Sequence, residues 1–322
     1  MIMSLYPWHQ IPWQHIVSLY QAKRIPHAIL IHGIDGLDNN LLAGKLTKSL
    51  LCLSPTEDFE SCGTCHSCQL YAAESHPDHS VVEPEETGKQ IKVDQIRQLK
   101  NVQSLMPKIS PAKTVIIKHA DQMNTNAFNS LLKLLEEPQQ NTTLILVAAS
   151  MRKLPITIKS RCQTISVSTP DRSIAIDWLK QHSDLSEQGL TTLLNLAHGA
   201  PLAALEIGEE GIEQSKSVFS GMAALMRCKA NPVQLSAQWQ SFDLISVLHQ
   251  LQAMIQTKLV TLLDKQEIPD PALIKHYWGI SDCIIHTMKL LSSQNNLNKT
   301  LLMEDLMVTI MQHASQIQQH QQ

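Results

Sequence analysis

The chain has 322 residues, which is long enough for two or three domains with a sizeable core. Its hydrophobic fraction of 43% is ordinary for a globular protein, and no apolar run approaches the length that spans a bilayer. The formal net charge of -3 provides no overall basic field that would steer the chain onto nucleic acid. These values exclude a membrane-spanning protein and disfavour one that binds DNA by itself. With no signal-peptide pattern at the N-terminus, they predict a cytoplasmic protein.

Short runs of β-branched and aliphatic residues predict five strands in the first half of the chain. In chain order they cover residues 28–33, 80–84, 114–119, 143–148 and 162–167. Nearly continuous apolar runs are typical of strands that are covered on both faces. Helical patterns lie between them: one begins at Asp94, and another is capped by Asn124 or Thr125 and ended by Pro138. Alternating strands and helices predict a parallel α/β sheet with right-handed connections.

From about residue 168 onward the chain shows helical patterns only. An apolar stripe with helical spacing is the longest of them, and breaks are expected at Gly199 and Pro201. The glutamine-rich residues 316–322 are predicted to be frayed. The predicted helices lie within residues 171–207, 244–262, 280–291 and 299–312.

The turn after the first predicted strand has the spacing of a phosphate-binding loop but not its chemistry. Such a loop reads G-x-x-x-x-G-K-[ST], in which the lysine neutralises phosphate charge and the hydroxyl holds Mg²⁺. Here Gly33 and Gly36 are present, but Asp38 replaces the last glycine, Asn39 the lysine, and Asn40 the hydroxyl residue. A carboxylate repels a triphosphate, so ATP is not expected to bind. Taken alone, the loop is also compatible with an ordinary strand–turn–helix corner.

The second acidic motif of an ATPase is damaged as well. An ATPase of this kind places Asp, and often Glu, at the end of a hydrophobic strand to handle Mg²⁺ and water. In this chain the strand ends in Lys118 and His119, and the nearest carboxylate, Asp121, lies three residues too far along to be a good Mg²⁺ ligand. Two damaged motifs at nucleotide-site spacing favour a degenerate nucleotide site over a coincidental turn.

Four of the seven cysteines are clustered, at Cys52, Cys62, Cys65 and Cys68. In a reducing compartment, clustered cysteines bind metal more often than they form disulfides. Four thiolates can close a tetrahedral zinc shell, and a closed shell is structural. A redox pair, an iron–sulfur cluster and free thiols are the alternatives. Histidines that could replace one cysteine as a ligand, but that are expected to be solvated instead, are His66, His76 and His79.

In combination, several stretches resemble the bacterial clamp-loader branch of the AAA+ family. They are residues 25–30 before the loop, the cysteine spacing C-x9-C-x2-C-x2-C, residues 129–138, and residues 154–162 with their S-R-C motif. The likeness is strong over residues 25–208 and weaker in the helical C-terminal part. Motor subunits of this family (gamma/tau) keep an intact phosphate loop and delta-prime subunits often lack it, so the chain is most similar to the delta-prime group.

The resemblance implies three domains. The first, residues 1–168, is expected to be a RecA-like AAA+ α/β domain with a zinc module at about residues 52–68. The second, residues 169–208, is expected to be a small helical lid domain. The third, residues 209–322, is expected to be an all-α collar that packs against other subunits.

The resemblance also assigns roles to the S-R-C motif, Ser160, Arg161 and Cys162. It implies that Arg161 is an arginine finger, which acts in trans on the ATP bound to a neighbouring subunit. Only a guanidinium offers a permanently charged planar fork of donors. A surface salt bridge, for example with Asp171, is the alternative role. Ser160 is expected to orient the approach to the strand, and Cys162 to be a small buried residue rather than a nucleophile.

The function implied by the resemblance is that of a stator without its own ATPase activity, an accessory subunit of the DNA-directed DNA polymerase III holoenzyme. Its expected partners are the motor subunit (gamma/tau) and the delta subunit, with the sliding clamp and primed DNA engaged through the complex. Zinc is the expected cofactor. Two other functions remain open: an active AAA+ ATPase of DNA repair with a variant loop, and a zinc-stabilised adaptor.

Two positions depart from the family pattern. Family zinc modules usually have eight residues between the first two cysteines, whereas nine separate Cys52 from Cys62, so Cys52 is the least certain ligand. AAA+ ATPases usually place a nucleotide-sensing arginine in the small second domain. The matching position after Gly199 is Leu202, which agrees with an empty nucleotide site.

Overall fold

The computed structural model describes residues 4–86, 88–264, 270–292 and 298–319, apart from residues 104 and 105. The described chain forms two compact units. One combines Met1–Asp184 with Ala197–Glu206, and the other combines Leu185–Leu196 with Ile207–Gln322. The predicted three-domain boundaries are not tested by this division and stay a prediction.

The first unit is built on a parallel sheet of five strands in the order β2-β3-β4-β1-β5. All five predicted strands are present, and β4 is buried at every position. β3 ends at Ile117, so Lys118 and His119 lie beyond the strand. The strands are β1 (Ala28–His32), β2 (His79–Val82), β3 (Lys113–Ile117), β4 (Thr142–Ala148) and β5 (Gln163–Ser166).

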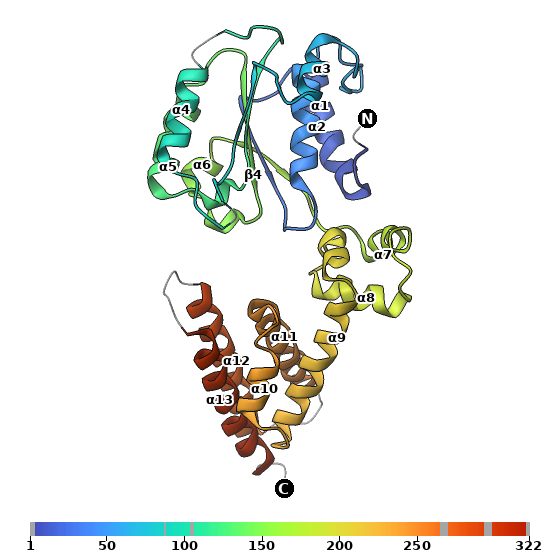
Figure 1. Ribbon diagram of the computed structural model, residues 1–322, viewed down its shortest axis with the longest axis vertical. Helices are drawn as coiled ribbons and strands as arrows, with labels where there is room; N and C mark the ends of the chain where they lie inside the picture. The colour runs from blue at the N-terminus through green and yellow to red at the C-terminus, as the bar shows by residue number, and fades with distance from the viewer. Residues whose placement is uncertain (1–3, 87, 104–105, 265–269, 293–297, 320–322) are drawn as a thin grey trace. The chain divides into compact units, whose positions relative to one another are not determined.

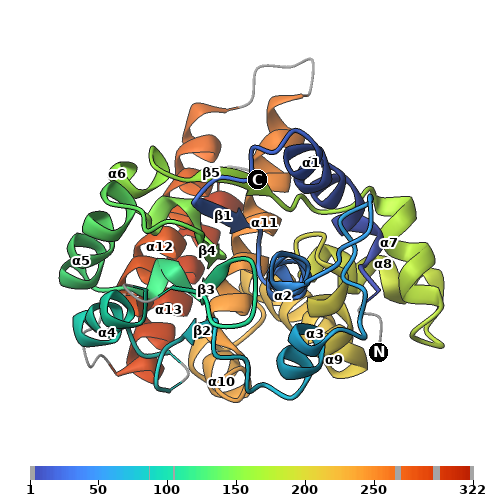
Figure 2. The same cartoon turned by 90° about the horizontal axis from the view of Figure 1, so that it is seen from above.

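Helices cover both faces of this sheet. Figures 1 and 2 show α4, α5 and α6 on one side and α1, α2 and α3 on the other. This three-layer parallel arrangement confirms the predicted RecA-like α/β class. The helices are α1 (Gln10–Gln21), α2 (Asn39–Leu51), α3 (His66–Ala72), α4 (Val93–Gln103), α5 (Thr125–Glu136), α6 (Ile156–Lys159) and α7 (Arg172–Lys180), with the short 3-10 turns η1 (Pro7–His9), η2 (Ala120–Gln122) and η3 (Met151–Lys153).

Local sequence signals set the ends of the helices that matter for function. Asn124 caps α5 because its side chain accepts a hydrogen bond from the backbone N–H of Ala127 at 2.8 Å. Pro138 cannot continue the helix, and α5 ends at Glu136 as expected. Leu154 and Ile158 anchor the short helix α6, because both side chains are buried in the core beside the sheet.

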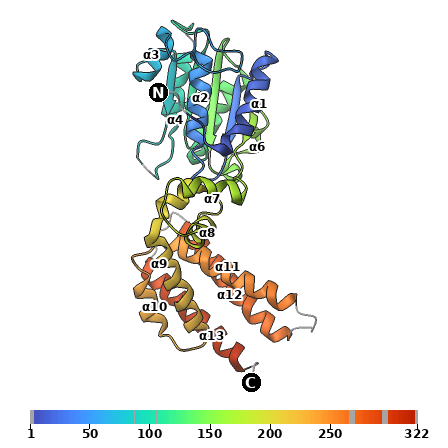
Figure 3. The ribbon, with the colours of Figure 1, turned by 90° about the vertical axis from the view of Figure 1, so that its right-hand side faces the viewer.

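The second unit is entirely helical in the part that the structure describes. It contains α8 (Glu187–Leu196), most of α9 (Pro201–Met226), α10 (Pro232–Gln238), α11 (Leu244–Leu263), α12 (Pro271–Ser292) and α13 (Lys299–Gln319). Figure 3 shows α11 and α12 lying side by side. The predicted apolar stripe forms the buried face of α11, so the all-helical prediction is confirmed.

The prediction of a frayed glutamine-rich end is wrong for residues 316–319. They continue α13 because Ile317, at 3% exposure, packs into the apolar core of the second unit. The Gln318 side chain also donates a hydrogen bond to the backbone carbonyl of Met226 at 3.2 Å. Residues 320–322 lie outside the described chain. Among the described helices, none combines the length and hydropathy needed to cross a bilayer.

Candidate functional sites

The predicted phosphate-type loop lies at the carboxyl edge of the sheet, where β1 leads into α2. A small cavity of about 100 Å³ opens there. Parallel α/β sheets commonly bind ligands at this edge. The residues that line the cavity come from the loop and from the ends of β3 and β4: Ile34, Asp35, Gly36, Asp38, Asn39, Asn40, His119, Val147 and Ala149.

Asn39 lines the cavity, but its side chain turns back onto the loop. Its side-chain amide donates a hydrogen bond to the carbonyl of Gly33 at 2.6 Å, and the residue is only 8% exposed. Its Oδ1 lies 2.8 Å from the point where a Cβ on Gly33 would stand. The position that carries the phosphate-neutralising cation in an ATPase is therefore occupied by a neutral, self-bonded amide.

Asp38 caps the helix whose N-terminus would otherwise face a phosphate. Its backbone is left-handed (φ 53), and its carboxylate accepts a hydrogen bond from the N–H of Leu41 at 3.0 Å. Free N–H groups and the helix dipole make a helix N-terminus a natural anion site. The Asp38 carboxylate pairs with one of these N–H groups, so the loop places a negative charge of its own at the start of α2.

Gly36 contacts the start of α9, at Leu202 and Ala203. Its carbonyl accepts a hydrogen bond from the N–H of Leu202 at 3.2 Å, and its φ of +83 favours glycine. A Cβ added here would lie 2.4 Å from the Cβ of Ala203 and 2.7 Å from the backbone N of Ala203. Gly36 thus allows the backbone of residue 203 to pack closely against the loop.

The N-terminal turn holds the same loop at the next residue. The carbonyl of Leu37 accepts hydrogen bonds from Trp8 Nε1 at 2.9 Å and from His9 Nε2 at 2.8 Å. Burial lowers the pKa of His9, which favours the neutral imidazole. No local pattern could reveal these contacts, because Trp8 and His9 lie 29 and 28 residues before Leu37.

The residues of the damaged acidic motif are also engaged elsewhere. Lys118 pairs with Glu83, with Nζ and Oε2 2.9 Å apart. Asp121 is 8% exposed and accepts a hydrogen bond from the N–H of Ser150 at 3.1 Å, so it joins η2 to the segment after β4. It does not line the cavity. Of this motif, only His119 faces the cavity.

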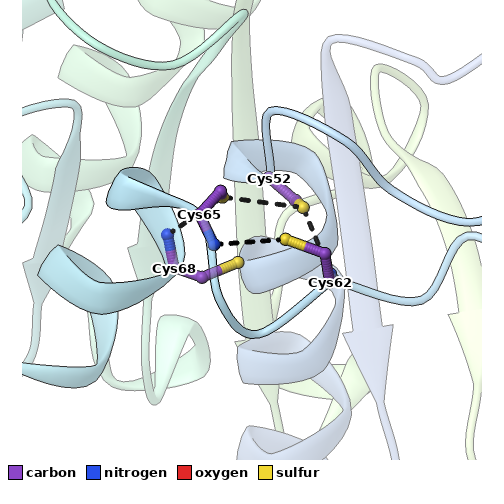
Figure 4. Close-up of side chains that lie close together, drawn as sticks. All are labelled: Cys52, Cys62, Cys65 and Cys68. Atoms are coloured by element: carbon purple, nitrogen blue, oxygen red, sulfur yellow. Dashed lines mark hydrogen bonds between the residues drawn. The ribbon is translucent and has the colours of Figure 1, made fainter.

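The four clustered cysteines come together at the end of α2 and the start of α3 (Figure 4). Their sulfur atoms all lie within 4.8 Å of one another. A tetrahedral zinc site with Zn–S distances of about 2.3 Å has sulfur–sulfur separations of about 3.8 Å. The Cys52–Cys65 sulfur separation of 4.0 Å matches this value and is far beyond a disulfide bond. Cys52 is thus included despite its longer spacing.

Backbone N–H groups point at the sulfur atoms of this cluster. Cys62 N–H donates to Cys52 Sγ and Cys65 N–H to Cys62 Sγ, each at 3.3 Å. The backbone N–H groups of Thr64 and Cys65 lower the pKa of Cys62 to about 6, whereas burial raises that of Cys68 to about 12. Four sulfur atoms this close together are a donor set that fits a divalent metal with sulfur preference.

Nearby histidines are engaged elsewhere. His76 Nε2 lies 2.9 Å from Ser67 Oγ and 3.0 Å from Ser110 Oγ, and His79 Nδ1 lies 2.9 Å from Thr114 Oγ1. Neither joins the cysteine group, and nor does His66. The expectation that His76 and His79 are solvated loop residues is wrong, because both side chains are largely inside the first unit and hydrogen-bonded.

Arg161 follows α6 and is exposed. Its Nη2 pairs with Glu136 Oε1 at 2.9 Å, and its Nη1 donates to the carbonyl of Thr157 at 3.1 Å. The salt-bridge partner is therefore Glu136 of α5 rather than Asp171. Glu136 lies within residues 129–138, which carry the family likeness, but nothing in the pattern singled it out from its neighbours.

The other residues of the S-R-C motif have structural contacts. Ser160 ends α6 and donates from Oγ to the carbonyl of Thr157 at 3.1 Å. Cys162 packs against the core of the sheet, and burial raises its pKa to about 11. A thiol that stays protonated is a poor nucleophile. Cys162 is partly buried, and its structural role stays a prediction.

Replacing Gly36 by alanine is expected to destabilise the first unit by about 2–4 kcal/mol, since positive-φ strain adds to a backbone clash with Ala203. The matched control is Gly88→Ala, which has a similar φ of +82 but nothing within 4 Å of the added Cβ. Urea unfolding of both variants measures the difference. Equal losses would show that packing against Ala203 contributes nothing.

Cys65→Ser is expected to abolish binding of one zinc ion per chain and to lower the midpoint of thermal unfolding, because metal binding to such a site contributes to folding. Cys228→Ser is the control, since Cys228 is exposed and lies in the second unit. Elemental analysis of the purified proteins measures the metal. Full zinc retention in Cys65→Ser would contradict the assignment.

The amino-acid sequence matches a family of known proteins. Residues 8–171 match the family model described as "DNA polymerase III, delta subunit". Three relatives are each called "DNA polymerase III subunit delta'". That of Pseudomonas aeruginosa is 31% identical over 95% of this chain and 97% of the relative. That of Haemophilus influenzae is 36% identical over 72% and 70%, and that of Escherichia coli 28% over 96% and 96%. The chain therefore belongs to the family of DNA polymerase III delta' subunits.

Proposed function

We propose that this chain is a clamp-loader subunit that neither binds nor hydrolyses ATP and that supplies Arg161 to the ATP site of a neighbouring motor subunit. One observation carries the proposal. Asp38 and Asn39 make hydrogen bonds within the chain's own phosphate-type loop, while the guanidinium of Arg161 is partly exposed after α6. The protein has lost the chemistry of one half of an ATP site and kept that of the other half.

The closed loop supports the absence of ATP binding. A triphosphate would have to displace the Asp38 carboxylate from the helix N-terminus and would then lie beside Asp35 and Asp38. No lysine or arginine is among the residues that line the cavity in the described chain. Without a cation to offset this repulsion, binding is unfavourable. An active ATPase with a variant loop would require such a cation.

The exposed guanidinium supports the role in trans. An arginine finger stabilises charge on the γ-phosphoryl group in the transition state, and a separate subunit can supply it. This requires a charge held at a defined place but free to meet a partner. Leu154 and Ile158 anchor the α6 turn in the core, whereas the Arg161 side chain keeps 38% of its surface exposed.

In this proposal the chain is a stator within the polymerase III holoenzyme. Its partners are a gamma/tau motor subunit and the delta subunit. By contacting the motor's ATP it would help to couple ATP binding to opening of the sliding clamp, and hydrolysis to its closure on primed DNA. The net charge of -3 agrees with DNA affinity that belongs to the complex as a whole.

The cysteine cluster would hold a structural zinc ion. When bound, zinc supplies a closed tetrahedral link and no catalysis. Cys52 at the end of α2 would be joined in this way to Cys62, Cys65 and Cys68 around the start of α3. Such a link would fix the segment that joins α2 to α3.

Arg161→Ala is expected to lower the clamp-dependent ATPase rate of the reconstituted complex at the neighbouring site by about tenfold or more, because the γ-phosphoryl charge loses its partner. Arg152→Ala is the control, since Arg152 is another exposed arginine of the same region. Circular dichroism checks that both variants fold. An unchanged ATPase rate in a complex with folded Arg161→Ala would refute the proposed arginine finger.

A further inference from the structure

We infer that Glu136 is a positioning residue that holds Arg161 in a resting place and competes with the ATP phosphate for it. The inference rests on the proposed role of Arg161 in trans. It adds that the guanidinium does not wait free in solvent: in this chain it already has an anionic partner, and it must exchange that partner for the γ-phosphoryl group.

The guanidinium is held from two directions. Glu136, the last residue of α5, contacts Nη2 at 2.9 Å, and the carbonyl of Thr157 in α6 accepts from Nη1 at 3.1 Å. Two different helices therefore set the direction of the planar fork. Among the ion pairs of the described chain, Arg161 appears with Glu136 alone, although Glu137 is the next residue.

The position of Glu136 explains why it is available to Arg161. A carboxylate in the last turn of a helix faces the negative end of the helix dipole, which is unfavourable for an anion. A cation next to it relieves this repulsion. Asn124 and Pro138 fix the two ends of α5, so Glu136 is presented beside the S-R-C turn rather than at an arbitrary point of the surface.

The strength of the pair suits an exchangeable contact. The two side chains keep 38% and 51% of their surface exposed, and exposed ion pairs shift an equilibrium by up to about fivefold. A γ-phosphate carries more charge than a carboxylate and offers several acceptor oxygens, so it can outcompete Glu136. While this ion pair is formed, the Glu136 carboxylate offsets the charge of the Arg161 guanidinium and keeps it against its own subunit.

The test is a set of single-turnover ATPase measurements on the reconstituted complex. Glu136→Gln is expected to raise the hydrolysis rate about two- to fivefold at low salt, because the competing charge is gone. The gain should shrink as salt screens the pair. Glu137→Gln removes the same charge one residue away and is expected to leave the rate unchanged. In the Arg161→Ala background, Glu136→Gln is expected to have no effect.

The outcomes separate this inference from the proposed function. If Arg161→Ala lowers the rate but Glu136→Gln leaves it unchanged or lowers it, the competition is refuted and the finger stands. A gain from Glu136→Gln that persists without Arg161, or that Glu137→Gln reproduces, also refutes it. If Arg161→Ala has no effect, the proposed function itself fails, and this inference fails with it.

Discussion

The hydrogen bond between the Asp38 carboxylate and the N–H of Leu41 is the contact on which the account of this protein depends. A helix that starts directly after a β-strand presents unpaired N–H groups, and in a phosphate loop these groups meet the nucleotide. Here a side chain of the loop takes that place, and the Asn39 amide closes the loop on Gly33. Two side chains of the loop thus close it on itself.

The surroundings of the loop reinforce this closure. Trp8 and His9 donate to the carbonyl of Leu37, and the N–H of Leu202 donates to the preceding carbonyl, that of Gly36. These bonds connect the N-terminal turn, the loop and the start of α9. These contacts brace the loop from within the first unit.

Much of the fold could be predicted from the sequence, because strand runs, Asn124, Pro138 and the α11 stripe are local signals. The cysteine cluster could also be predicted, since ligand spacing is local. The rest depends on contacts between distant residues. No residue near Leu37 in the sequence indicates its contact with Trp8. The sequence pattern does not distinguish Glu136, which pairs with Arg161, from Glu137. The glutamine-rich composition of residues 316–319 suggested fraying, but burial of Ile317 keeps them helical. The prediction for His79 is wrong for the same reason, because its partner Thr114 lies 35 residues away along the chain. His76 bonds both Ser67, nine residues away, and the distant Ser110.

Calorimetric titration of the purified chain with ATP and Mg²⁺ tests the central claim most directly, because it asks only whether the closed loop admits a triphosphate. We expect no heat of binding up to millimolar ATP, with or without Mg²⁺, since Asp38 already holds the anion position and no cation lines the cavity of the described chain. Saturable, Mg²⁺-dependent binding in the micromolar range would contradict the account and would indicate a working nucleotide site.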